Sequence, residues 1–157
     1  MIVTVTLNPS IDRTAPIAGP LRRGQVNRLG SSTEVAAGKG VNISRVLRGA
    51  GIETCAVVPA GAKGRLTLGL NHDDIPHQVV PVAAAVRTNL TITEPDGTTT
   101  KINEPGADLS PEELTAVEEA IVEKSSGAQW VVLSGSLPPG VPCLLYTSPS
   151  PRDQRGS

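Results

Sequence analysis

The chain has 157 residues, of which 38% are hydrophobic, 18% charged and only 1% aromatic, and its formal net charge is -1. This length allows one domain with a real core, built here from Val, Leu, Ile and Ala, and the near-neutral charge gives no electrostatic reason to expect nucleic acid or an anionic membrane as partner. No stretch reaches membrane-spanning length, no secretory signal pattern is present, and Cys55 and Cys143 lack metal-ligand spacing, so a reduced cytoplasmic protein is expected.

The first half of the chain alternates apolar strands with a helical pattern. Residues 2–7, IVTVTL, form a short β-branched run that predicts a buried strand ending at Asn8-Pro9. Residues 41–51 predict a helix ending at Gly51, and residues 53–61 predict a second buried strand. Residues 62–76 fit either a short helix or an irregular connection. The expected apolar face of the helix consists of Ile43, Val46, Leu47 and Ala50.

The second half contains a hairpin, a capped helix and a third strand. Two alternating runs at 88–93 and 98–103 flank EPDG, which is strong hairpin chemistry, and the polar Thr and Asn face predicts that this hairpin stands partly away from the core. Residues 110–124 predict a helix, and 128–135 a third buried strand. This order of elements indicates an α/β fold with parallel strands joined by helices. The helix is marked by Ser110 as N-cap, Pro111 at N1, Glu113 in a capping box, and an apolar face of Leu114, Val117 and Ile121.

Four places in this pattern could carry chemistry, and each has a plainer reading. Gly38-Lys39-Gly40 precedes a helix, where backbone N–H groups and an ammonium could bind an anion, although glycine before a helix is common. Asp12 follows the first strand, where open α/β sheets bind ligands, or it caps a turn. The Arg87 guanidinium could bind a phosphate through two parallel N–H groups, or it could remain solvated. Ser136, in SGSLPPG after the third strand, could approach a ligand or belong to a tight structural turn.

Taken together and in order, four segments are more specific than any one of them. TLNPSID, GKGVNISRVL, RTNLTITEPDGTTTKINEPG and LSGSLPPGVP resemble the PfkB family of ribokinase-like sugar kinases, over residues 1–142, and most of all its bacterial 1-phosphofructokinase branch. The resemblance implies a Rossmann-like α/β/α ribokinase fold with a small β-sheet lid, whose strands would come from about 13–36 and 85–104. It also implies a homodimer through the lid.

The activity implied by the resemblance is phosphoryl transfer from ATP with Mg²⁺ to a phosphosugar, here fructose 1-phosphate giving fructose 1,6-bisphosphate. Tagatose-6-phosphate kinase or 6-phosphofructokinase of the same family is the alternative. From another class, the runner-up is a non-catalytic sugar-phosphate-binding fragment, and this is what we expect the 157-residue chain by itself to be. Cutting an α/β sheet midway would also leave apolar faces uncovered and favour aggregation.

The resemblance assigns substrate-side roles to individual residues. Asp12 matches the aspartate that binds sugar hydroxyls, and Ser136 matches the loop that faces the substrate. Ala37 replaces the family's usual glycine, which a negative φ would tolerate. The remaining substrate-binding assignments are Gly38, Lys39 and Asn42 in the first glycine-rich signature, Arg87 and Asn89 in the lid, and Glu104 where the hairpin returns to the cleft.

The end of the chain departs from the family. Nothing in residues 105–157 matches the second family signature, which supplies the catalytic base and much of the ATP site, so no residue is assigned as catalytic. Residues 143–153, CLLYTSPSPRD, back-translate to a common sequencing-library adaptor. We therefore expect 143–157 to be adaptor read-through after a truncated N-terminal kinase fragment.

Overall fold

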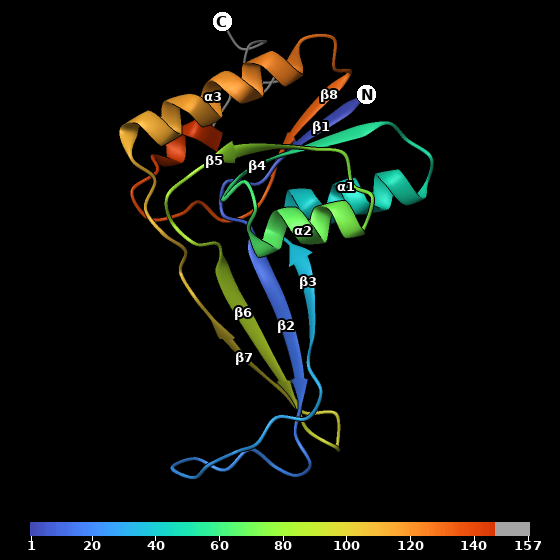
Figure 1. Ribbon diagram of the computed structural model, residues 1–157, viewed down its shortest axis with the longest axis vertical. Coiled ribbons are helices and arrows are strands. Elements are labelled where there is room, and N and C mark those ends of the chain that lie inside the picture. The colour runs from blue at the N-terminus through green and yellow to red at the C-terminus, as the bar shows by residue number, and fades with distance from the viewer. Residues whose placement is uncertain (147–157) are drawn as a thin grey trace, which may run out of the picture.

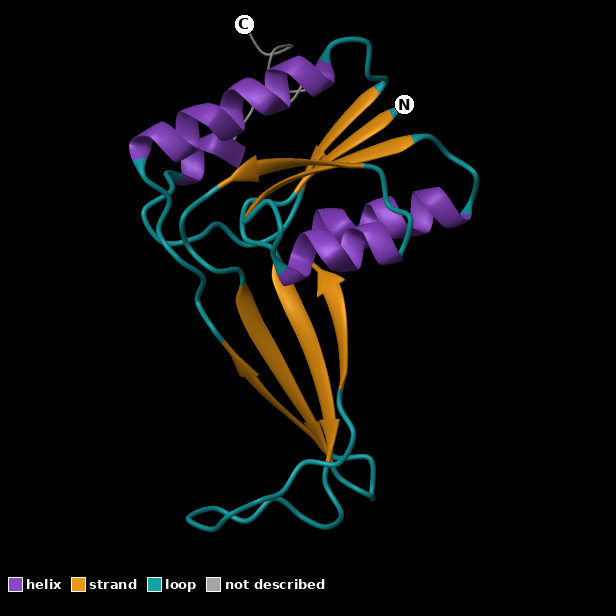
Figure 2. Cartoon of the chain, in the orientation of Figure 1, coloured by secondary structure: helices purple, strands orange, loops and turns teal. Residues whose placement is uncertain are grey.

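The computed structural model describes residues 1–146 and contains two four-stranded sheets and three α-helices (Figures 1 and 2). In chain order the elements are β1 (Ile2–Val5), β2 (Ser10–Pro16), β3 (Thr33–Ala37), α1 (Lys39–Gly49), β4 (Thr54–Ala60), α2 (Arg65–His72), β5 (His77–Pro81), β6 (Arg87–Thr93), β7 (Thr99–Asn103), α3 (Pro111–Ser125), β8 (Trp130–Leu133) and the 3₁₀ turn η1 (Cys143–Tyr146). The expected α/β class is confirmed. From residue 147 on, the expected adaptor-derived tail lies outside the described residues.

The first sheet is parallel and has the order β5-β4-β1-β8. Figure 1 shows α3 on one face of this sheet and α1 with α2 on the other. Alternate residues of β4 pack on the two faces of the sheet, because side chains of a strand point alternately to opposite faces. Val57 belongs to one buried cluster with Val117 of α3, whereas Val58 belongs to the other with Leu66 and Leu70 of α2. All five of these side chains are fully buried.

The second sheet has the order β3-β2-β6-β7 and extends away from the helical body (Figure 2). β2 runs parallel to β6, while the β2–β3 and β6–β7 pairs are antiparallel. The expected hairpin is therefore present, as β6 and β7, and it lies in this sheet away from the main core. β2, β3 and β5 were not predicted as strands from residue pattern; β5 pairs with β4 and completes the first sheet.

Helix α1 begins at Lys39, two residues before the predicted start, and buries a different face. Gly40, Val41 and Ser44 are its buried residues, while Val46 is 71% exposed and Ala50 is also exposed. The Ser44 hydroxyl lies 2.8 Å from Thr4 Oγ1 and 2.9 Å from Thr54 Oγ1, so a chain of hydroxyls joins the helix to the sheet. The prediction from apolar spacing was wrong at Val46 and Ala50, since a satisfied polar contact replaces apolar packing on the inner face.

Some of the predictions for the other elements are confirmed and one is wrong. Residues 65–72 form α2, which resolves the open choice at 62–76 in favour of a helix. Helix α3 begins with the expected capping box, in which Ser110 and Glu113 bond reciprocally. Strand β8 was predicted to be buried, which is wrong, because it forms the sheet edge and leaves Trp130 70% exposed. Within residues 1–146, no helix has the length and apolar character that crossing a bilayer would require.

Candidate functional site

A polar cleft of about 430 Å³ lies where the two sheets meet. It is bordered by the turn after β1, the start of α1, the inner face of the second sheet and the loop after β8. Because β1 and β8 are parallel neighbours, the loops after their carboxyl ends meet here, as in ligand sites of open α/β sheets. The lining residues are Asn8, Ser10, Asp12, Gly38, Lys39, Asn42, Arg87, Asn89, Asn103, Gly135 and Ser136. Seven of the eight residues expected at the site are among them.

Close packing of α1 on β1 fixes the entry to the helix. Gly38, the N-cap, has φ of 131°, and a Cβ there would stand 2.5 Å from Thr6 Cγ2. A Cβ on Gly40 would stand 2.5 Å from Thr6 Oγ1, the atom that accepts a hydrogen bond from Val41 N–H. Only glycine fits either position, so the helix N-terminus and Lys39 are held at the cleft. Ala37 does not have positive φ, and its methyl is tolerated as expected.

Asp12 and Asn89 face each other on paired strands. They are register partners on β2 and β6, and Asn89 Nδ2 donates to Asp12 Oδ1 at 2.9 Å. Since a carboxylate only accepts, the amide must turn its nitrogen toward Asp12, and Asn89 Oδ1 is left buried without a partner. The sequence interpretation of Asp12 as following the first strand requires a correction, because Asp12 lies within β2.

Arg87 and Ser136 contribute hydrogen-bond donors to the same cleft. Arg87 donates to the carbonyls of Glu104 and Asn8 and, at 3.4 Å, to Ser136 Oγ, while its Nε is buried without a partner. Ser136 Oγ also lies 3.3 Å from Asn8 Nδ2. Because both of its neighbours are donors, the Ser136 hydroxyl accepts twice and its own hydrogen is free for a further acceptor.

Asn8 was missed as a site residue by the sequence reasoning. Its amide nitrogen donates to Pro105 O at 2.9 Å and reaches Ser136 and the Leu137 carbonyl, so it ties the loop after β7 to the loop after β8. The Asn-Pro pair was interpreted only as the end of a strand. Three further lining residues were also missed: Ser10, Asn103 and Gly135. Of these, Ser10 donates to Asp12 Oδ1, a contact that its i, i+2 position on a strand could have suggested.

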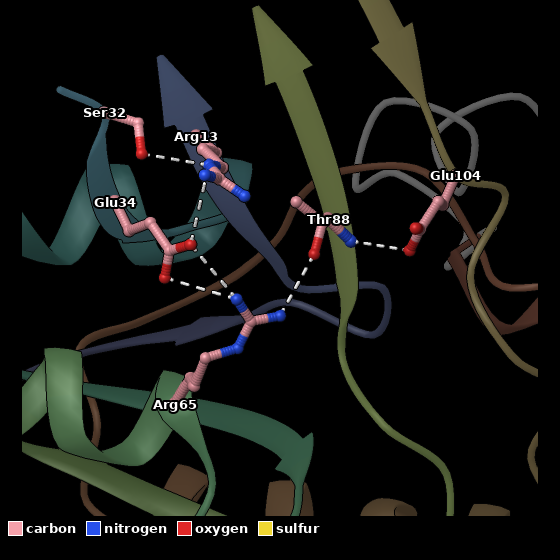
Figure 3. A network of polar contacts seen from close by, with 6 residues as sticks. All are labelled: Arg13, Ser32, Glu34, Arg65, Thr88 and Glu104. Atoms are coloured by element: carbon pink, nitrogen blue, oxygen red, sulfur yellow. Dashed lines mark hydrogen bonds and ion pairs between the residues drawn. The ribbon is translucent and has the colours of Figure 1, made fainter. Parts of the chain in front are cut away.

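Glu104 is the expected site residue that does not line this cleft. Its carboxylate accepts the backbone N–H of Thr88 at 2.8 Å, between Arg87 and Asn89 in sequence (Figure 3). Arg65, at the start of α2, donates to Thr88 Oγ1 and to both oxygens of Glu34 on β3. These contacts fix β6 against the helical body, so the structure gives Glu104 a supporting contact near the cleft.

The family resemblance implies Mg²⁺. In kinase sites Mg²⁺ is usually held by one or two carboxylates together with waters and substrate phosphates. Within residues 1–146, no group of three or more His, Cys, Asp or Glu side chains could hold a metal ion. No chemical step is derived through a metal in this part of the chain.

The fold and cleft together define an α/β protein with a polar cleft at the carboxyl ends of its parallel strands. Residues 5–148 match the profile of the pfkB family carbohydrate kinases, and the chain belongs to this family. It is 32% identical over 145 residues to a 1-phosphofructokinase of Vibrio cholerae, covering 89% of this chain and 44% of that protein. It is 33% identical over 150 residues to an ATP-dependent 6-phosphofructokinase isozyme 2 of Mycobacterium tuberculosis, covering 92% and 43%.

Solved structures agree with this assignment. Phosphofructokinase-2 of Escherichia coli in complex with fructose-6-phosphate superposes with a TM-score of 0.82 at 32% identity, over 90% of this chain and 47% of that one. The expected ribokinase-like fold is thus confirmed. The chain spans less than half the length of the relatives it matches.

Proposed function

We propose that the cleft binds a phosphorylated sugar. The observation that carries this proposal is the sorting of hydrogen-bond polarity within one cavity. Asp12 is an acceptor, which suits sugar hydroxyls. Lys39, the Arg87 guanidinium and the Ser136 hydroxyl are donors, two of them cationic, which suit a phosphate.

The backbone supports the phosphate end of this arrangement. Gly38 and the first turn of α1 bring N–H groups and the positive end of the helix dipole to the cleft, and no side chain caps this helix end. Among the residues that the structure describes, Lys39 and Arg87 form no ion pair with a carboxylate. Their charge is therefore available to an anionic ligand.

For the whole enzyme, we propose an ATP- and Mg²⁺-dependent phosphofructokinase-type kinase that converts fructose 1-phosphate to fructose 1,6-bisphosphate. Curated relatives of nearly equal identity are named for 1-phosphofructokinase and for 6-phosphofructokinase activity, so the second activity, or the related tagatose-6-phosphate kinase activity, is the alternative. The second sheet would act as the lid and as the homodimer interface. The cytoplasm would be its compartment.

Within such a reaction the residues of this chain orient the substrate. Phosphoryl transfer depends mainly on positioning and on neutralising charge. Asp12 and Asn89 would fix the sugar ring through its hydroxyls, and Lys39 and Arg87 would hold the phosphate already present on the substrate. ATP would supply the phosphoryl group. No described residue is assigned as the catalytic base.

Ligand titration of the 157-residue chain tests the binding proposal. Isothermal titration with fructose 1-phosphate, fructose 6-phosphate and fructose should give binding of both phosphates and at least tenfold weaker binding of fructose. Arg87→Met should remove most of this preference, and Arg22→Met, an exposed arginine in the loop after β2, is the matched control. Equal affinity for fructose and its phosphates would contradict the proposal.

Two further experiments test the chain as a unit. A kinase assay of the chain with fructose 1-phosphate and Mg-ATP should give no turnover, and measurable turnover would refute the inactive-fragment reading. The division into a kinase segment, 1–142, and adaptor read-through, 143–157, remains a proposal. Sequencing the genomic locus without that adaptor tests it, since recovery of the same tail codons would overturn it.

A further inference from the structure

Arg45 lies on α1, one turn after Asn42, and its guanidinium joins three segments. Its Nη1 donates to Asn42 Oδ1 at 2.7 Å, and its Nη2 donates to the Ala36 carbonyl at the end of β3 and to Asp73 Oδ2 at 3.0 Å. Asp73 directly follows α2. The side chains of both members of the Arg45–Asp73 pair are about 30% exposed, at 32% and 27%, so the pair is partly shielded from solvent.

This contact determines which way the amide of Asn42 faces. A guanidinium has only donors, so the amide atom next to it must be the oxygen. The other amide atom, Nδ2, is then the group that Asn42 can offer to the cleft it lines. Asn42 consequently belongs with the donors of the cleft, beside Lys39.

We infer that Arg45 is a positioning residue that makes Asn42 a donor-only contact for an acceptor oxygen of the ligand, with Asp73 holding Arg45 in place. The inference rests on the proposed function, because the acceptor oxygen is taken to belong to a sugar phosphate. Without Arg45 the amide could rotate and turn its carbonyl oxygen toward a phosphate, which would repel it. Arg45 itself does not line the cleft.

Helix α1 supplies a matched control one turn further on. Arg48 donates through Nε to the Asp74 carbonyl at 3.1 Å and pairs with the Asp74 carboxylate, so it also ties α1 to the segment after α2. It is more exposed than Arg45 and does not line the cleft. Arg48→Ala therefore removes a similar helix-to-loop tie and leaves Asn42 untouched.

A double-mutant cycle tests the inference. Fructose 6-phosphate is titrated into the wild-type chain and into Arg45→Ala, Asn42→Ala, the double variant and Arg48→Ala. Arg45→Ala should weaken binding about ten- to a hundredfold, the range of one hydrogen bond to a charged group, yet cause no further loss in the Asn42→Ala background. Arg48→Ala should bind as wild type. Additive losses from Arg45→Ala and Asn42→Ala would overturn the inference.

Amide NMR of the unliganded chain separates this inference from the proposed function. The side-chain amide signal of Asn42, assigned by its loss in Asn42→Ala, should shift in Arg45→Ala and in Asp73→Asn but not in Arg48→Ala. An unchanged signal in Arg45→Ala would overturn the inference even if sugar phosphate binds. If the wild-type chain binds no sugar phosphate while the signal shifts as expected, the proposed function fails and the orientation of Asn42 by Arg45 stands.

Discussion

Asn89 and Asp12 stand opposite each other on β6 and β2, with the amide nitrogen of Asn89 donating to Asp12 Oδ1 at 2.9 Å. Across the same cleft Asn42 is held in the reverse sense, with its oxygen on Arg45. Two amides of the same chemical kind are thus held in opposite senses around one cleft, because one has an anionic neighbour and the other a cationic one. This contrast is the physical basis for separating a hydroxyl end of the cleft from a phosphate end.

Asp12→Asn should weaken the binding of fructose 6-phosphate about tenfold or more. The substitution keeps the shape of the side chain but removes its charge and one acceptor atom, and hydrogen bonds to charged groups contribute about 1.5–3 kcal/mol. Calorimetric titration of the chain measures the change. Asp96→Asn, which alters an acceptor in the distant β6–β7 turn, is the control. Wild-type affinity in Asp12→Asn would show that the carboxylate is not a ligand contact.

Gly38→Ala should lower the free energy of unfolding by about 1–3 kcal/mol through the strained backbone alone. The contact between the added Cβ and Thr6 should lower it further. Gly97→Ala isolates the backbone part, because Gly97 has φ of 88° and nothing within 4 Å of its added Cβ. Urea unfolding followed by circular dichroism gives both values. We expect the larger loss for Gly38→Ala and partial recovery in the Thr6→Ser background, which lacks the clashing methyl. Equal losses at the two glycines would contradict the packing argument.

The stabilisation that the ionised Glu113 carboxylate gives the fold should be lost as the pH falls through the acid range. Two backbone N–H groups, of Ser110 and Ala83, donate to its carboxylate and lower the pKa of Glu113 below its usual value. The folded pKa is depressed, so the stabilisation is present above the unfolded pKa and is lost as the pH falls through the folded one. The free energy of urea unfolding, measured from pH 7 down to the acid range, should therefore fall less steeply in Glu113→Gln.

Glu118→Gln is the control for this pH effect, since Glu118 is an exposed glutamate on the same helix. It should leave the slope of stability against pH unchanged. An identical acid-range slope in wild type and Glu113→Gln would show that the contacts of Glu113 do not stabilise the fold.

Local sequence signals predicted those parts of the fold that local physics determines. The capping box of α3 and the turn between β6 and β7 follow from neighbouring residues, and both are present. The exposed Val46 and the edge position of β8 depend on which elements pack nearby, and apolar spacing carries no such information. Likewise Asn8 joins loops that are distant in sequence, so only the folded chain brings it to the cleft.

The exposed edge of β8 predicts self-association of this chain. Trp130 is 70% exposed on a strand that, within residues 1–146, pairs only with β1, and an apolar, unpaired strand edge is a template for pairing with another chain. Trp130→Lys should lower the fraction of large species in sedimentation velocity at a given concentration, because a charged side chain on an edge strand opposes pairing.

Val122→Lys controls for the added charge in this comparison. Val122 is 73% exposed, but it lies on helix α3, which offers no backbone groups for strand pairing. The lysine at position 122 should leave self-association near the wild-type level. Equal improvement by both lysines would assign the effect to net charge, and a monomeric wild-type chain would remove the edge as a cause of association.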